Sequence, residues 1–168
     1  MTEHLTTQAM IHYLLQCTKI TDVNRVLFVD QQHPDVVDYL STLTLIGLKE
    51  HFGRQCSPLF PAPWIYRGYS DDVSHLYGRG FGTTRLLDPG LRADNELFGS
   101  TAELGYQDFD TLVIGSIARN IELARELARY FAPDRTIWIH GEDTPPIADQ
   151  VRFYRTFGTH LLVRSIDV

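Results

Sequence analysis

Residues 25–30 read Arg-Val-Leu-Phe-Val-Asp, an apolar run that ends in an acid. A continuous apolar run of this length, bounded by polar residues, is typical of a strand buried on both faces of a parallel sheet. Working outward from it, similar runs occur at residues 110–115 and 136–140. These runs predict parallel strands of one α/β sheet.

Segments with helical spacing of apolar residues lie between and before these strands. Helices are predicted at residues 6–17, 35–52, 118–131 and 145–157. Further strands are predicted at residues 55–59 and 161–166. Such alternation places helices on both faces of the sheet. The predicted fold is α/β, with a single doubly wound, mostly parallel sheet of Rossmann-like or flavodoxin-like type and an N-terminal helix. We expect residues 1–24 to form a helical segment and residues 25–168 the Rossmann-like domain.

The periodic pattern fades between residues 61 and 105, where prolines, glycines and aromatic residues accumulate. Long segments without regular structure are uncommon in compact domains unless they carry function. We expect short elements and a working surface here, with a strand within residues 80–87. The sequence leaves the structure of this segment otherwise open.

Composition and charge narrow the class of protein. With 168 residues, 43% of them hydrophobic, and a formal net charge of −6, the chain fits one ordered globular domain. The negative charge opposes binding to nucleic acid and to anionic membranes, so neither is expected as a partner. No signal peptide or membrane-spanning run is recognisable, and a cytoplasmic location is expected. Cys17 and Cys56 lack a CxxC spacing and are expected to be reduced and buried.

Polar residues follow the predicted strands, where ligands bind in parallel α/β sheets. They are Asp30 with His33, Gly115 with Ser116, and Gly141 with Glu142 and Asp143. Among them, Asp30, His33 and Glu142 are candidate acid or base groups. An acid after the first strand either faces a ligand or caps the following turn, and both interpretations of Asp30 stay open.

The other two strand ends also have two interpretations each. The free N–H groups of Ser116–Arg119 and the Arg119 guanidinium suit a phosphate or carboxylate, unless Ser116 only caps the helix. Glu142 and Asp143 suit a sugar hydroxyl, a ribose or a metal-bound water. Capping of the next helix by Asp143 or Thr144 is the alternative, and it is favoured for Asp143.

The segment Tyr77–Gly82 places Arg79 between Gly78 and Gly80, with aromatic residues on either side. The glycines allow close approach of the backbone, and the aromatic rings suit stacking on a sugar or base. Arg79 and Gly80 are therefore candidate ligand-binding residues. A tight turn with Tyr77 and Phe81 in the core is the alternative.

Several motifs are absent from the sequence. The seven histidines show no metal-ligand spacing, and His140 at the end of an apolar strand is expected to pack in the core. No GxxxxGK[ST], no GxSxG and no GxGxxG after the first strand occurs, so triphosphatase, serine-hydrolase and standard dinucleotide-binding classes are disfavoured. No cofactor and no metal are expected.

Short segments across most of residues 25–157 resemble the N-terminal half of poorly characterised bacterial glycosyltransferase-like proteins. They are Val26–Asp30, Asp38–Ser41 with Gly47–Lys49, Tyr77–Phe81, Gly115–Arg119 and Gly141–Asp143. The resemblance implies a Rossmann-like half of a two-domain sugar transferase, the half that faces the acceptor. It places Asp30, Arg79, Arg119, Glu142 and Asp143 along the interdomain cleft. Because no second nucleotide-binding domain follows, transfer by this chain alone is not expected.

A five-stranded α/β chain whose first predicted strand reads VLFVD, at residues 26–30, is also similar to response-regulator receiver domains. Receivers need a second acid beside Asp30, an Asp after the third strand and a Lys after the last. Here Gln31 and Gly115-Ser116 stand at the first two places, and no lysine lies near residues 161–166. Phosphotransfer of that kind is excluded.

Three functions remain. The leading one is a glycosyltransferase-like domain that binds a sugar, nucleotide or small anionic ligand at the strand ends, as a partner subunit without the donor-binding domain. The second is a non-catalytic interaction module, whose N-terminal helix and aromatic segment 64–81 contact a protein partner or a second copy. The third is a small hydrolase or isomerase that uses Glu142 and His33.

Overall fold

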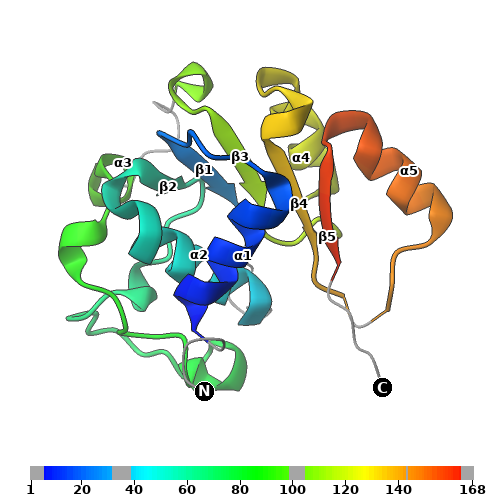
Figure 1. Cartoon of the computed structure of the whole chain (residues 1–168). Coiled ribbons are helices and arrows are strands. Elements are labelled where there is room, and N and C mark those ends of the chain that lie inside the picture. The colour runs from blue at the N-terminus through cyan, green and yellow to red at the C-terminus, as the bar shows by residue number, and fades with distance from the viewer. Residues whose placement is uncertain (1–5, 32–38, 99–104, 143, 164–168) are drawn as a thin grey trace.

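The computed structural model describes residues 6–31, 39–98, 105–142 and 144–163 (Figure 1). A five-stranded sheet lies at its centre, with every strand pair parallel and the order β2-β1-β3-β4-β5. Its strands are β1 (Val26–Val29), β2 (Cys56–Pro58), β3 (Thr111–Ile114), β4 (Thr136–His140) and β5 (His160–Val163). The predicted α/β fold with a single parallel sheet is confirmed, in the flavodoxin-like strand order.

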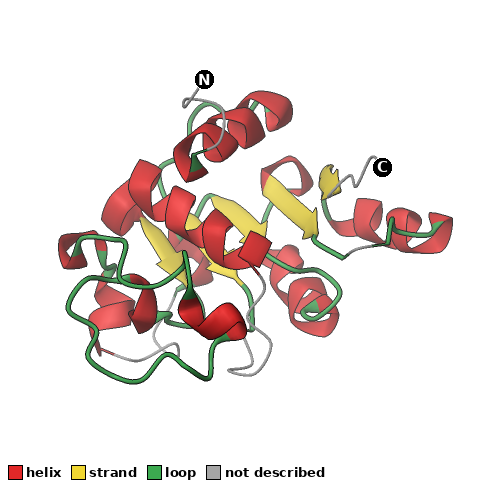
Figure 2. Cartoon of the chain, turned by 90° about the horizontal axis from the view of Figure 1, so that it is seen from below, coloured by secondary structure: helices red, strands yellow, loops and turns green. Residues whose placement is uncertain are grey.

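Helices lie on both sides of the strands (Figure 2). They are α1 (Thr7–Thr18), α2 (Tyr39–Phe52), α3 (Asp94–Phe98), α4 (Ile121–Leu127) and α5 (Ala148–Phe157). Short 3₁₀ turns are η1 (Gly53–Gln55), η2 (Pro63–Ile65), η3 (Tyr77–Gly80), η4 (Pro89–Leu91), η5 (Tyr106–Asp108), η6 (Ala128–Tyr130) and η7 (Pro133–Arg135). In the part of the chain that the structure describes, no helix is long and apolar enough to cross a membrane.

Alternate side chains of the strands form two cores. Val26 and Phe28 of β1 pack with α1 and α2 on one face of the sheet. Leu27 and Val29 point to the other face, where α4 and α5 cover them. Burial on both faces explains why β1 is apolar throughout instead of alternating apolar and polar residues.

The N-terminal helix α1 packs directly on α2. Thr6 caps it by accepting a hydrogen bond from the backbone N–H of Ala9 at 3.1 Å, and Ile11 is fully buried. Gly47 of α2 permits the close approach, because a Cβ at this position would lie 2.6 Å from the carbonyl oxygen of Thr7. The predicted N-terminal helix is thus part of the core on that face.

The strand expected within residues 80–87 is absent, and that prediction is wrong. Leu87 forms only an isolated parallel bridge with Tyr66. The reason is the backbone, since Gly80, Gly82 and Arg85 all have positive φ angles, which an extended strand cannot contain.

A buried ion pair attaches this irregular segment to α2. The Nζ of Lys49 donates to the carbonyl of Cys56 at 2.6 Å and pairs with the carboxylate of Glu96 in α3. Tyr66 donates its hydroxyl to the same carboxylate at 2.8 Å. Because every charged group has partners, the pair holds the segment in one position on α2 and β2.

Two predicted helices begin later than expected. The helix expected from residue 118 begins at Ile121, and the helix expected from Pro145 begins at Ala148. The backbone N–H of Ile147, immediately before α5, donates to Gln150 at 3.0 Å. Ser116 and Thr144 therefore do not cap these helices, and both lie between a strand end and the helix that follows it.

Candidate functional site

The carboxyl ends of β1, β3 and β4 lie side by side at one edge of the sheet. The chain leaves β1 toward β2 on one side and leaves β3 toward β4 on the other. Ligands of open α/β sheets bind at such a switch point, outside the strand ends. In this fold the switch point lies between β1 and β3, beside Asp30 and Ser116.

Asp30 is buried at the switch point and is held by three donors. The guanidinium of Arg119 lies 2.9 Å from Oδ2, and the Asn120 amide donates to Oδ1 at 2.8 Å. The hydroxyl of Ser41 in α2 also donates to Oδ2. Charge-assisted hydrogen bonds of this kind fix the turn after β3 to the end of β1.

Asn120 extends this network along the edge. Its Oδ1 accepts from the backbone N–H of Gln31 at 2.7 Å, and its Nδ2 donates to the carbonyl of Ser116 at 2.6 Å. Gly115 makes room for the network, since a Cβ there would lie 2.5 Å from the Ser41 hydroxyl oxygen. Sequence patterns pointed to Asp30, Gly115 and Arg119, whereas Ser41 and Asn120 were missed. A serine inside an apolar helix was the available signal for Ser41.

Ser116 and His140 contain buried polar atoms without a partner. Ser116 is 0% exposed and His140 is 2% exposed. The His140 Nε2 lies 2.8 Å from the carbonyl of Thr144, whereas neither its Nδ1 nor the Ser116 Oγ has a hydrogen-bond partner within the described residues. Since buried polar atoms are nearly always paired in folded proteins, these two atoms are suited to an external partner.

The turn after β4 begins with Gly141, which is partly buried, and Glu142, which is exposed. Burial and, to a smaller extent, the negative charge of Glu142 raise the pKa of the Tyr154 phenol. Tyr154 belongs to α5 and lies against His140, with ring centroids 6.3 Å apart. Glu142 therefore places a negative charge in the same region as the unpaired His140 nitrogen.

Arg79 lies on η3 and is exposed. The neighbouring Gly78 fits against Tyr39, the first residue of α2, because a Cβ at Gly78 would lie 2.2 Å from the Tyr39 hydroxyl. This contact brings η3 beside the helix that follows β1. Phe81 is 84% exposed, so the alternative that placed its ring in the core is wrong. Gly80 turns the chain here with φ of 73°.

The structure does not bring all candidate residues into contact with one another. Arg79 forms no ion pair with Asp30, although both belong to the described residues. His33 and Asp143 lie outside the described residues. Among those that are described, no group of three or more potential metal ligands occurs.

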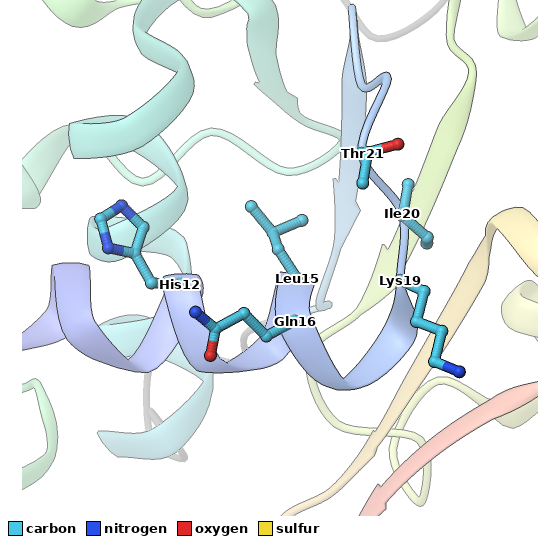
Figure 3. Close-up of a pocket in the computed structure, with 6 residues that line it drawn as sticks. All are labelled: His12, Leu15, Gln16, Lys19, Ile20 and Thr21. Atoms are coloured by element: carbon cyan, nitrogen blue, oxygen red, sulfur yellow. The ribbon is translucent and has the colours of Figure 1, made fainter.

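Two grooves border α1. The larger, with a volume of 470 Å³, is lined by the C-terminal half of α1 and the residues after it (Figure 3). Since this part of the chain leads into the start of β1, the groove lies toward the amino ends of the strands. The smaller groove, of 180 Å³, is apolar and lies between α1, α2 and the ends of β4 and β5.

The protein is of the α/β class with flavodoxin-like strand order. At the carboxyl ends of its strands, the switch point holds a buried polar network. No family model, curated protein or solved structure matches the chain. No family is therefore assigned, and the residues at the switch point are the guide to function.

Proposed function

We propose that this chain is a glycosyltransferase-like domain that binds a sugar or nucleotide at the carboxyl edge of its sheet. The observation that supports this most is the pair of buried, unpartnered polar atoms on Ser116 and His140 beside the switch point. Ligand-binding sites usually contain a few fixed polar groups that orient the ligand, and these two atoms would supply such groups.

The exposed groups around the edge suit the parts of such a ligand. The Arg79 guanidinium is able to bind a phosphate through two hydrogen bonds, and the exposed ring of Phe81 to stack on a sugar or base. The carboxylate of Glu142 accepts hydrogen bonds from sugar hydroxyls. Asp30 and Arg119, which bind each other, act as positioning residues that hold the turn at Ser116.

Binding at this edge does not make the chain a complete transferase. Transfer of a sugar requires several groups that stabilise the leaving diphosphate, and of Arg79 and Arg119 the latter already pairs with Asp30. A partner subunit or second domain would supply them. Whether the bound molecule is donor or acceptor depends on that partner.

Isothermal titration calorimetry with uridine diphosphate glucose, glucose and inorganic diphosphate tests the proposal. We expect heat with the nucleotide sugar, and about tenfold weaker binding in Arg79→Ala, equivalent to roughly 1.4 kcal/mol. Arg67→Ala is the matched control, because Arg67 is also exposed on the irregular segment. The absence of heat with all three probes would refute the proposal.

A second candidate function is self-association through α1 and β5. Within the described residues β5 pairs only with β4, so its outer edge is available to another strand. Tyr13 of α1, 65% exposed, lines the apolar groove that also contains Val163 of β5. A second copy of the chain, joined edge to edge, would cover both features.

Light scattering of the full chain tests this candidate. A dimer is expected, and Tyr13→Ser should weaken it about tenfold. Tyr130→Ser is the control, because this tyrosine is similarly exposed but belongs to η6. A monomer at all accessible concentrations would rule self-association out.

A further inference from the structure

Ser116 and His140 lie on neighbouring strand ends and face the same side of the sheet. Ile114 and Trp138, two residues earlier in each strand, are register partners in the core under α4 and α5. The backbone N–H of Ile117 donates to the carbonyl of Ile139 at 3.0 Å, so the two chain segments stay adjacent beyond β3.

The directions of the two side chains follow from their neighbours. The missing Cβ of Gly115 points toward Ser41 and Phe28, on the side of α2. Consecutive residues of an extended chain point to opposite sides, so Ser116 points toward the face of α4 and α5. His140 also lies on that face, against Tyr154 of α5.

The hydrogen bond of His140 fixes its tautomer. Nε2 lies 2.8 Å from the Thr144 carbonyl oxygen, which can only accept, so Nε2 carries the hydrogen. In the neutral ring, Nδ1 then carries a lone pair and needs a donor. Ser116 presents a hydroxyl that donates as well as accepts.

These two atoms favour a neutral donor group over an anion. A phosphate or carboxylate oxygen has no hydrogen to give to the Nδ1 lone pair. The Arg119 guanidinium pairs with Asp30, and Glu142 adds negative charge near Tyr154. An anion at this position would therefore be repelled, whereas a hydroxyl satisfies both atoms.

We propose that Ser116 and His140 form a subsite for a sugar hydroxyl, which donates to His140 Nδ1 and accepts from Ser116 Oγ. This subsite rests on the proposed function and names the part of the ligand that the edge recognises. The phosphate of a nucleotide sugar then lies elsewhere, near the exposed Arg79. Both subsite atoms are shielded from water, so hydrogen bonds to them are stronger than at the surface.

Nitrogen-15 spectra of histidine-labelled protein at pH 8 test the subsite. We expect His140 to show the Nε2–H tautomer and its Nδ1 resonance to move on addition of glucose or uridine diphosphate glucose, but not of inorganic diphosphate. His160 is the internal control, because its Nε2 also contacts a backbone carbonyl, at 3.1 Å, yet the residue is less deeply buried than His140.

Calorimetry of Ser116→Ala gives a second, independent readout. The variant should bind uridine diphosphate glucose about tenfold more weakly than the original chain does. Its affinity for inorganic diphosphate should be unchanged. His160→Gln should change neither affinity.

Two results would overturn the subsite. The first is a hydrogen on His140 Nδ1. The second is a shift of the His140 Nδ1 resonance that inorganic diphosphate also produces and that persists in Ser116→Ala. Binding of diphosphate and nucleotide sugar without any effect at His140 would refute the subsite alone. Failure of every probe to bind would refute the proposed function as well.

Discussion

Asp30 shows what one buried carboxylate does at the switch point. It is 2% exposed and joins β1, α2 and the turn after β3 through Arg119, Asn120 and Ser41. Its hydrogen bonds are made within the chain, so its main effect is on the position of that turn. In the proposed function, the groups that this turn presents contact the ligand.

Replacement of Asp30 by Asn should destabilise the protein by about 3 kcal/mol, because it leaves the Arg119 guanidinium without its counter-charge in a partly buried position. Urea unfolding measures the change. Asp22→Asn is the control, since Asp22 pairs with Arg135 at 2.7 Å but is exposed, and its loss should cost about 0 to 1 kcal/mol. Equal losses in the two variants would contradict the role given to Asp30.

The two cysteines should differ sharply in reactivity. Both are free, but Cys17 is exposed, which corrects the expectation that it is buried, while Cys56 is buried. Burial raises the pKa of the Cys56 thiol to about 12, because the thiolate would lose its hydration. Iodoacetamide at pH 8 should modify Cys17 in the folded protein and Cys56 only after unfolding, as read by mass spectrometry.

The same pKa shift gives a pH dependence of stability. In the unfolded chain the thiol ionises with its ordinary pKa of 9.0, whereas folded Cys56 keeps its proton to about pH 12. Between these values the unfolded chain binds fewer protons, so the free energy of unfolding should fall as pH rises. Cys56→Ala should reduce the slope of that decline, and an unchanged slope would contradict it.

At the scale of elements, α1 depends on one glycine of α2. Gly47→Ala should destabilise the protein by about 1 to 3 kcal/mol despite the better helix propensity of alanine, because the new methyl meets the Thr7 carbonyl and Ile11. Urea unfolding measures the loss, and trypsin cleavage after exposed Lys19 should become faster as α1 detaches.

Gly105→Ala provides the control for this prediction. Gly105 has a negative φ, −70°, and a Cβ there meets only the ends of the flexible side chains Gln107 and Asp108. Its replacement should change stability by about 0.5 kcal/mol or less. If Gly47→Ala behaves in the same way, the close contact between α1 and α2 is not required.

The regular elements were predictable because their patterns are local. The apolar run of β1 and the helical spacing of α1 each predict one structure, and both are observed within a residue or two of the expected bounds. The start of α4 was not predictable, because Asn120 bonds with Asp30, 90 residues away in sequence. The turn at Arg85 was missed, since non-glycine residues rarely adopt positive φ.

Of the candidate site, the sequence predicted the common edge of the strands but not the contacts along it. Parallel pairing alone brings Asp30 and Gly115 together. That Asp30 binds Arg119, and that His140 has an unpaired nitrogen instead of simply packing, depends on side-chain directions that no local pattern specifies.

At the scale of the molecule, one buried ion pair joins the irregular segment to the sheet layer. Lys49→Met should cost about 3 to 5 kcal/mol, because it leaves the Glu96 carboxylate buried without a counter-charge. Thermal or urea unfolding measures it. Adding Glu96→Gln to Lys49→Met should recover part of the loss, since the amide oxygen still accepts from Tyr66.

Arg54→Met tests whether burial matters here. Arg54 pairs with Asp94 of α3, close along the chain to the Lys49 pair, but both side chains are exposed. Its loss should cost about 0 to 1 kcal/mol. A cost equal to that of Lys49→Met would show that the segment is held by something other than the buried pair.

The enclosure of α2 also has a consequence for synthesis of the chain. Its apolar surface is covered by α1, made earlier, and by the segment that ends with Glu96, made much later. While the ribosome adds the residues between α2 and Glu96, part of the apolar surface of α2 stays uncovered. Exposed apolar surface favours aggregation of unfinished chains. Slower translation of this stretch should therefore raise the demand of the nascent protein for chaperones.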